Sequence, residues 1–194
     1  MAVTKVFPAS LIREGWEAGL RDFGENYVQE FEGKYEQVKD LQGARFHLIG
    51  HLQSNKSRRA SELFDVIETV DSAKLARRLE EAGKALEVML EVKLSEEESK
   101  HGADPEAVGE LAEAVRGHGN LRLAGLMTMP PWEEDAEKTR PYFLRLRELA
   151  ESVARPGERL GLSMGMSHDF EVAIQEGATH IRVGTALFGR RKKA

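Results

Sequence analysis

The sequence predicts an α/β protein, a single-domain (β/α)8 TIM barrel over residues 1–194. Short apolar runs rich in β-branched residues alternate with segments of helical pattern along the whole chain. Glycine follows several of the helical segments, where it commonly ends a helix, and no linker rich in Pro, Ser or Gly divides the chain. This alternation indicates parallel strands joined by right-handed crossovers. An open doubly wound sheet is the competing architecture.

Eight strands are expected, at Ala2–Lys5, Arg21–Gly24, Arg45–Ile49, Val66–Val70, Leu86–Lys93, Leu121–Met127, Arg159–Leu162 and His180–Val183. Helices are expected between them, at Ser10–Ala18, Tyr27–Leu41, Lys56–Glu62, Ser72–Ala82, Pro105–Arg116, Glu133–Val153 and Phe170–Gln175. Because barrels typically have about 250 residues, a chain of 194 residues must form a minimal one without a second domain.

Composition excludes several classes of protein. The net charge of −5 argues against a nucleic-acid binder, and we interpret the basic tail Gly189–Ala194 as a solvated terminus. The charged stretch Leu94–Glu106 is interpreted as a solvated loop. No apolar run approaches the roughly 20 residues that a membrane span needs, and the absence of Cys fits a reducing compartment. We therefore expect a cytoplasmic protein without membrane or nucleic-acid partners.

Two glycine-containing turns near the C-terminus are candidate phosphate sites. Gly161–Ile174 passes from a strand through a turn with Ser163 and Met164 into a helix that Ser167 or Asp169 could cap. Ile181–Gly189 repeats the pattern, with Gly184 allowing close approach and Thr185 supplying a hydroxyl. In a barrel, the loops after the seventh and eighth strands commonly bind phosphate. Tight turns without a ligand are the alternative.

Other polar residues also follow or end strands. His47 and His51 are four residues apart but have no accompanying acidic ligand, so we expect no metal site. Arg182 lies within a strand, where it needs a partner, either a ligand ring or a carboxylate.

Lys5 ends the first predicted strand, from which its amine could reach across the barrel mouth toward the phosphate loops. Partial burial would lower the pKa of a lysine and favour the neutral amine that forms an imine with an aldehyde. Pyridoxal 5′-phosphate is the common cofactor that carries both an aldehyde and a phosphate. An aldolase-type lysine, a salt-bridged lysine and an exposed lysine remain open.

Six ordered motifs resemble those of the pyridoxal phosphate homeostasis protein family: AVTK, FGENYVQE, FHLIGHLQSNK, GLMTMP, LSMGMSHDFEVAI and IRVGTALFG. The resemblance spans Ala2 to Gly189 and implies a barrel similar to the N-terminal domain of alanine racemase, the fold type III of pyridoxal-phosphate proteins. Lys5 matches the lysine that forms the aldimine, and Arg182 matches an arginine that faces the pyridine nitrogen. Further matches are to phosphate-loop residues (Ser163, Met164, Gly184 and Thr185) and to residues near the ring (Asn26 and His47).

The resemblance implies a protein that holds pyridoxal 5′-phosphate for intracellular homeostasis of this cofactor, without efficient catalysis and without a catalytic residue of its own. An amino-acid racemase of low activity is the alternative, but the second domain that gives the racemases a tyrosine acid/base is missing. Pyridoxal-phosphate-dependent apoenzymes are candidate recipients, and we expect a monomer. Family members have about one helix before the first strand, which we expect this barrel to lack.

Overall fold

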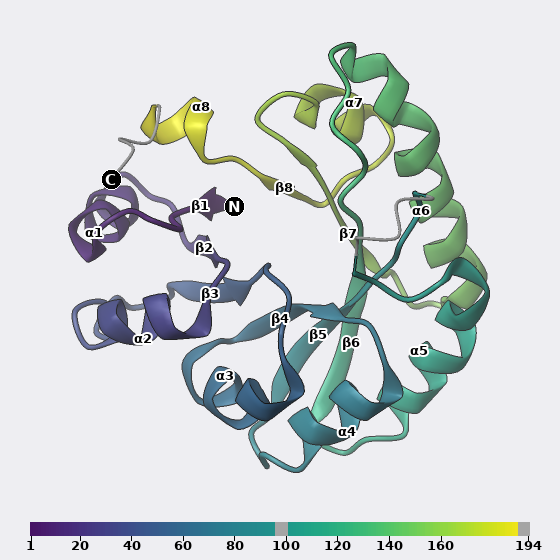
Figure 1. The fold of residues 1–194 in the computed structure, drawn as a ribbon, viewed down its shortest axis with the longest axis horizontal. Coiled ribbons are helices and arrows are strands. Elements are labelled where there is room, and N and C mark those ends of the chain that lie inside the picture. Colours follow the sequence, from purple (N-terminus) through teal and green to yellow (C-terminus); the bar gives the residue numbers. More distant parts are fainter. Residues whose placement is uncertain (96–100, 190–194) are drawn as a thin grey trace.

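The computed structural model describes residues 1–95 and 101–189, in which eight parallel strands follow one another around a barrel in sequence order (Figure 1). The strands are β1 (Ala2–Val3), β2 (Asp22–Glu25), β3 (Arg45–Leu48), β4 (Val66–Val70), β5 (Leu86–Glu91), β6 (Leu121–Met127), β7 (Gly161–Met166) and β8 (His180–Arg182). This arrangement confirms the predicted (β/α)8 fold class.

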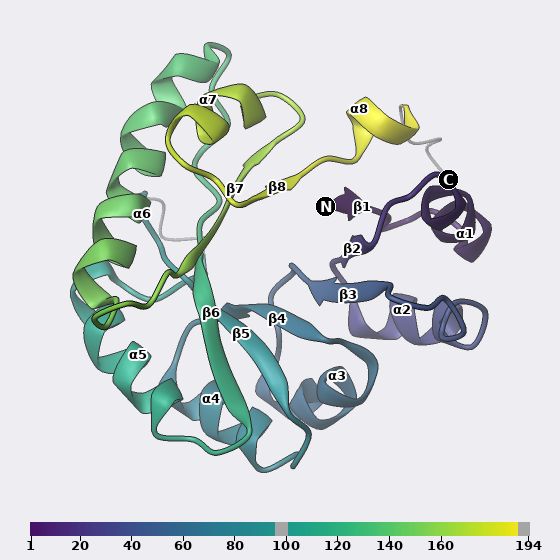
Figure 2. The same ribbon diagram turned by 180° about the vertical axis from the view of Figure 1, so that it is seen from behind.

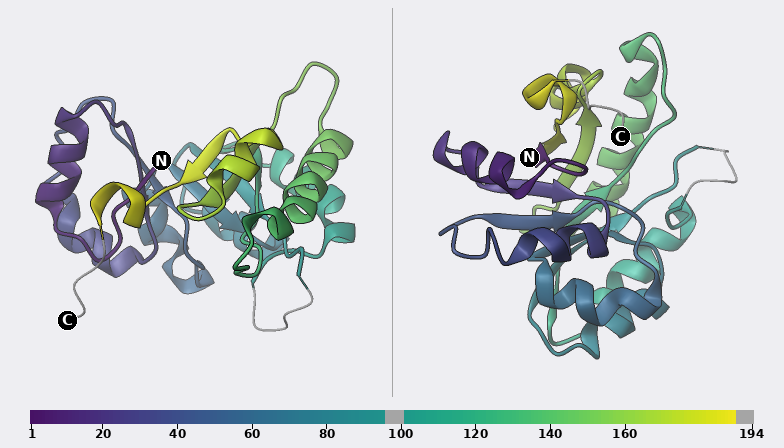
Figure 3. Two further views of the ribbon diagram at one scale, coloured as in Figure 1. Left: turned by 90° about the horizontal axis from the view of Figure 1, so that it is seen from above. Right: turned by 60° about the vertical axis from the view of Figure 1, so that its left-hand side comes forward.

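The α-helices lie outside the strands, as the front, back and side views show (Figures 1, 2 and 3). They are α1 (Ala9–Glu17), α2 (Val28–Tyr35), α3 (Ser57–Leu63), α4 (Ala73–Glu80), α5 (Val108–Arg116), α6 (Arg140–Val153), α7 (Phe170–Gln175) and α8 (Thr185–Phe188). Short 3-10 turns η1 (Ser54–Lys56), η2 (Pro105–Ala107) and η3 (Ala136–Thr139) precede α3, α5 and α6.

The barrel is closed by hydrogen bonds between the first and last strands. Val3 N–H donates to Val183 O at 2.9 Å, and Val183 N–H donates to Met1 O at 3.1 Å. Phe7 and Phe188 then contact each other, with ring centroids 5.6 Å apart, so that α8 packs beside the beginning of α1. Segments from the two ends of the sequence therefore form one side of the barrel mouth.

Aromatic side chains fill the layer between the first strands and their helices. The ring of Phe31 on α2 lies 4.8 Å from those of both Phe46 and Phe64, and Phe31 is fully buried. Burial of such a side chain contributes about 1.5–3 kcal/mol. Because this packing fixes α2 against β3, it also fixes the residues that α2 directs toward the end of β1.

Three element boundaries differ from the predictions by four residues or more, and β1 ends at Val3 rather than at Lys5. Strand β7 runs from Gly161 to Met166, whereas the sequence predicted Arg159–Leu162. Helix α6 begins at Arg140 rather than at Glu133, because a proline at its second position favours the start of a helix. Helix α2 ends at Tyr35, earlier than predicted, and continues as hydrogen-bonded turns.

Two further differences concern loops. The short helix α8, Thr185–Phe188, was not predicted, and the strand predicted to reach Lys93 ends at Glu91. The centre of the predicted charged loop and all but the first residue of the predicted basic tail lie outside the described residues.

Candidate functional site

Lys5 lies in a tight turn immediately after β1, where Phe7 N–H donates to Thr4 O at 3.1 Å. The preceding residue is held from two sides. Thr4 Oγ1 donates to Glu25 Oε1 at 2.8 Å, and Lys34 Nζ donates to Thr4 O at 3.1 Å. Because these partners belong to β2 and α2, the backbone that carries Lys5 is fixed by the neighbouring β/α unit.

Val6, in the same turn, has a φ of 60°, in the left-handed region that β-branched residues avoid. Its N–H donates to Glu30 Oε1 at 2.6 Å, and that carboxylate also accepts from Lys34 Nζ at 2.6 Å. The strained conformation is thus held by a hydrogen bond from α2, as is common where a turn positions a functional residue.

The amine-bearing turn faces a cavity of about 260 Å³ at the barrel mouth. Its lining combines apolar walls, a guanidinium and small polar groups: Val3, Lys5, Asn26, Ile49, Met129, Trp132, Met166, Ser167, His168, Arg182, Gly184 and Thr185. Five of the eight predicted site residues therefore line this one cavity: Lys5, Asn26, Arg182, Gly184 and Thr185.

One end of the cavity is rich in backbone and hydroxyl groups. Ser167 Oγ accepts from Gly184 N–H at 3.4 Å and from Ala186 N–H at 3.5 Å. A Cβ at Gly184 would lie 3.3 Å from Val3 O, so a larger residue would crowd β1 here. Long hydrogen bonds of this kind leave the N–H groups available to a stronger acceptor, such as an anion.

Arg182 is the buried cation of the cavity, with an exposed fraction of 3%. One of its terminal nitrogens donates to Ser163 Oγ and the other to Thr128 O, each at 2.8 Å. Burial lowers the pKa of Arg182, while the charges of Glu68, Asp169 and Glu91 oppose this effect. These contacts fix the plane of the guanidinium beside the cavity.

His47 lies deeper in the barrel, in a hydrogen-bonded series that continues from Arg182. Ser163 Oγ donates to Glu68 Oε2 at 2.5 Å, and Glu68 Oε1 lies 2.7 Å from His47 Nδ1. His47 Nε2 lies 3.0 Å from Asp22 Oδ1. Burial alone would lower the pKa of His47, but the hydrogen bonds to the two carboxylates outweigh it, and the net shift is upward. A protonated ring can donate to both carboxylates.

The predicted location of Ser163 and Met164 in a turn after the seventh strand was wrong. Both lie within β7 and are fully buried. The Ser163 hydroxyl accepts a hydrogen bond from Arg182 and donates one to Glu68, and Met164 packs in the hydrophobic core. Neither residue lines the cavity, and His47 does not line it either. The strand is longer than predicted because Gly165, with a φ of 88°, continues the chain through an irregularity instead of ending the strand.

Sequence reasoning did not assign the walls of the cavity. Ile49 and Met166 carry no chemical signal, and Trp132 lies in a loop. Ser167 was considered only as a helix cap. Its position in the turn directly after β7 could have placed it at the mouth, because the loops that follow barrel strands form that end of the barrel.

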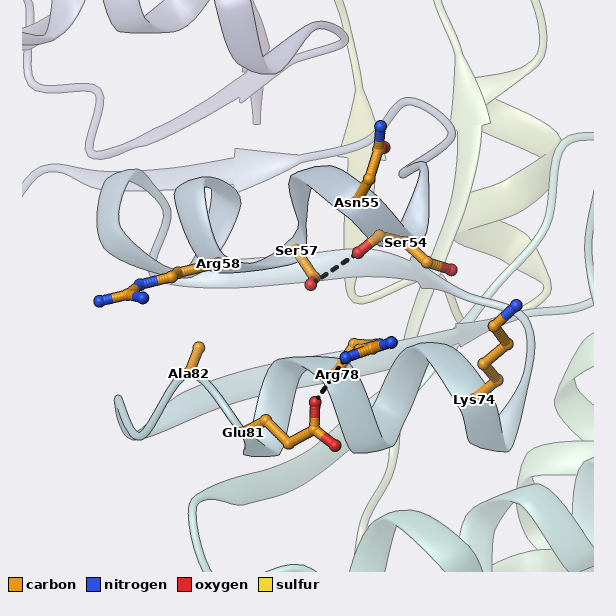
Figure 4. Close-up of a pocket in the computed structure, with 8 residues that line it drawn as sticks. All are labelled: Ser54, Asn55, Ser57, Arg58, Lys74, Arg78, Glu81 and Ala82. Atoms are coloured by element: carbon orange, nitrogen blue, oxygen red, sulfur yellow. Dashed lines mark hydrogen bonds and ion pairs between the residues drawn. The ribbon is translucent and has the colours of Figure 1, made fainter.

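A larger groove, of about 560 Å³, lies on the outer surface between η1, α3 and α4 (Figure 4). Figure 4 shows Arg58, Lys74 and Arg78 along this groove, and Arg78 donates to Glu81 at 3.0 Å. None of the predicted site residues lines it. The mouth cavity is therefore the better candidate for the functional site.

Two features are absent from the part of the chain that the structure describes. No group of three or more His, Cys, Asp or Glu residues there could hold a metal ion. No helix within residues 1–95 and 101–189 is long and apolar enough to cross a membrane.

Residues 2–192 match the family model described as "Alanine racemase, N-terminal domain". Proteins named "Pyridoxal phosphate homeostasis protein" are similar over nearly the whole chain. The protein from Pseudomonas aeruginosa is 49% identical over 98% of this chain and 84% of its own length. The protein from Aquifex aeolicus is 43% identical over 99% of this chain and 86% of its own length.

Solved structures give the same result. PipY from Synechococcus elongatus, solved with PLP bound, is 42% identical with a TM-score of 0.89, and the match covers 97% of this chain and 91% of PipY. Alanine racemase from Clostridium difficile shares the fold, with a TM-score of 0.79 at 13% identity over 99% of this chain and 52% of the racemase. The chain belongs to the alanine racemase N-terminal domain family, in the group of the pyridoxal phosphate homeostasis proteins.

Proposed function

We propose that this protein binds pyridoxal 5′-phosphate in the mouth cavity as an imine of Lys5 and serves intracellular homeostasis of the cofactor, without efficient catalysis. One observation carries the proposal. Lys5 and Arg182 line the same cavity as Ser167, Gly184 and Thr185. An amine, a permanent cation and a set of anion-binding donors are the groups that an aldehyde, a pyridine ring and a phosphate require.

The residues present fit this cofactor. The phosphate would be held by Ser167, Thr185 and the backbone N–H groups of Gly184 and Ala186, and the apolar walls would cover the ring. A guanidinium keeps its protons at neutral pH, so Arg182 would leave a facing ring nitrogen without one. When bound, the cofactor supplies an aldehyde and an electron sink, and Arg182 would weaken the latter.

Three predicted residues take indirect roles in this proposal. Ser163 would position Arg182, and His47 would support Ser163 through Glu68, since these side chains form one hydrogen-bonded series. Met164 would contribute only through its place in β7. Asn26 lines the cavity directly and would contact the cofactor ring.

The proposal is tested by incubating the purified protein with pyridoxal 5′-phosphate and recording its absorption spectrum. An imine band should appear, and borohydride should then attach the cofactor irreversibly to the peptide that contains Lys5. Lys5→Ala should lose both the band and the attachment. Lys93→Ala is the matched control, because Lys93 lines a neighbouring cavity and not this one. A Lys5→Ala variant with an unchanged band would refute the proposal.

A carrier role is favoured over racemisation by the lining of the cavity. Racemisation on the cofactor needs an acid or base on each face. Among the described residues that line the cavity, the ionisable side chains are Lys5, His168 and Arg182, with neither a tyrosine nor a carboxylate. Amino-acid isomerisation by the loaded protein should therefore not exceed that of the free cofactor. If it does, His168→Ala will show whether His168 is the second base.

In this role the chain would act as one cofactor-binding domain, residues 1–194, in the cytoplasm. Pyridoxal-phosphate-dependent apoenzymes would receive the cofactor from a monomer. Light scattering of the purified, cofactor-loaded protein would test the monomeric state, because a dimer would have twice the mass of one chain.

A further inference from the structure

A second cavity, of about 380 Å³, lies beside the proposed cofactor cavity. The two share Asn26, Ile49, Met129 and Met166 as walls. The rest of its lining includes residues that end or follow β3 and β5, and its most buried polar side chain is that of Glu91. The proposed function leaves this carboxylate unused.

Glu91 is the last residue of β5 and has an exposed fraction of 4%. Its Oε2 atom is buried and accepts no hydrogen bond from any residue in the described ranges. A buried acceptor without a donor is unfavourable, and more so when it is charged. Glu91 therefore needs a donor that the described side chains do not supply.

The surroundings of Glu91 favour a cationic donor. Burial and the charge of the Asp71 carboxylate raise the pKa of Glu91 to about 7, an effect that the charge of Arg182 opposes. A cation beside Glu91 would offset both the burial of its charge and the repulsion from Asp71. Lys93 and the stacked rings of His51 and His101 face the same cavity, but these residues are more exposed than Glu91 and lie nearer its opening.

Two further observations define the cation. The described residues include no cluster of three acidic or histidine ligands, so a metal ion is not favoured. The walls beside Glu91 include the apolar side chains of Ile49, Met129 and Pro130, which suit an alkyl chain. An alkylammonium group satisfies both the carboxylate and these walls.

We propose that this second cavity is a binding site for a small primary ammonium compound, whose N–H groups donate to Glu91 while its alkyl chain packs on Ile49, Met129 and Pro130. The site goes beyond the proposed cofactor function and does not depend on it. A bound amine would lie beside the cavity that contains Lys5, separated from it only by shared walls.

The test uses the full chain at pH 8 without added pyridoxal phosphate and follows methyl resonances by NMR during titration with n-butylammonium chloride. Saturable shifts at Ile49 and Met129 are expected. Glu91→Gln should weaken binding at least about tenfold, as should replacing the probe by n-butanol, because each change removes a charged hydrogen bond. Glu134→Gln removes a carboxylate from a loop at the mouth without touching the cavity and should leave binding unchanged.

Two outcomes would overturn the site. Absence of saturable shifts would mean that water or a proton satisfies Glu91. Equal losses in Glu91→Gln and Glu134→Gln would mean that general charge attracts the amine. Thermal melting of each variant verifies that it is folded. Because the titration contains no cofactor, a failure to bind n-butylammonium would not count against cofactor binding at Lys5.

Discussion

At the scale of single residues, the turn that carries Lys5 contains local strain. Val6 has a φ of 60° and is 57% exposed, so its side chain gains little from packing while its backbone is unfavourable. Asn adopts this conformation more readily, and strain of this kind costs on the order of 1–3 kcal/mol. We expect Val6→Asn to raise the free energy of unfolding by about 1 kcal/mol in urea titrations. Val6→Ala, which keeps a Cβ without that tolerance, should gain less, and equal stabilities would contradict the argument.

Glu91 should affect stability through pH. Its pKa is raised from 4.5 to about 7 in the folded protein, by burial and by Asp71. The folded state thus favours the neutral acid, so the contribution of Glu91 is fully present below pH 4.5 and is lost as the pH rises to about 7. The full loss is about 3 kcal/mol at 1.36 kcal/mol per pKa unit.

Glu91→Gln should remove this loss. Urea unfolding at pH 4.5 and at pH 8 is therefore expected to show a smaller decrease in stability for Glu91→Gln than for the natural protein. The same pH dependence in both proteins would show that Glu91 ionises normally.

At the scale of elements, a buried ion pair connects β1, β2 and α2. Lys34 Nζ lies 3.0 Å from Glu25 Oε1 and 2.6 Å from Glu30 Oε1, and Glu25 is fully buried. Lys34→Met would leave Glu25 without its cation, which typically costs 3–5 kcal/mol. We expect a loss of about this size in urea unfolding.

The double variant Lys34→Met/Glu25→Gln provides the control, since it removes both charges. It should regain part of the stability lost in Lys34→Met. Because Thr4 contacts both side chains, Lys34→Met should also loosen the turn that carries Lys5 and weaken cofactor binding. A Lys34→Met variant as stable as the natural protein would show that the pair contributes little.

The elements also show how far sequence reasoning could reach. The order of the strands could be predicted from the alternation of strands and helices along the chain, because crossovers between parallel strands are right-handed. The end of β7 could not be predicted from the sequence, since Ser163 and Gly165 have low strand propensity and their conformation depends on pairing with β8. The sequence also did not show how deep in the barrel each side chain lies. His47 and Ile49 share one strand face, but Ile49 is nearer the mouth and lines the cavity, whereas His47 lies in the layer below.

At the scale of the whole molecule, one hydrogen-bonded series crosses the barrel interior. It runs from Asp22 on β2 through His47 and Glu68 to Ser163 and Arg182, and so joins five strands below the mouth cavity. Burial alone would raise the pKa of Glu68, but its partners His47, Arg182 and Ser163 lower it overall. Opposite charges inside the barrel therefore stabilise one another and give the cavity floor a fixed geometry.

This series predicts a pH dependence of the fold. The pKa of His47 is raised above 6.5, so its protonated form is bound more tightly in the folded state. Its contribution is then fully present below pH 6.5 and is lost as the pH rises through the raised folded value. We expect urea midpoints to fall between pH 6 and pH 9 in the natural protein, and to fall less in His47→Gln. His118→Gln, on the loop after α5, should keep the natural dependence. His47→Gln removes one of the two cations that act on Glu68 and therefore lowers stability by itself, so the comparison concerns the change with pH. An unchanged slope would mean that His47 is neutral in the folded barrel.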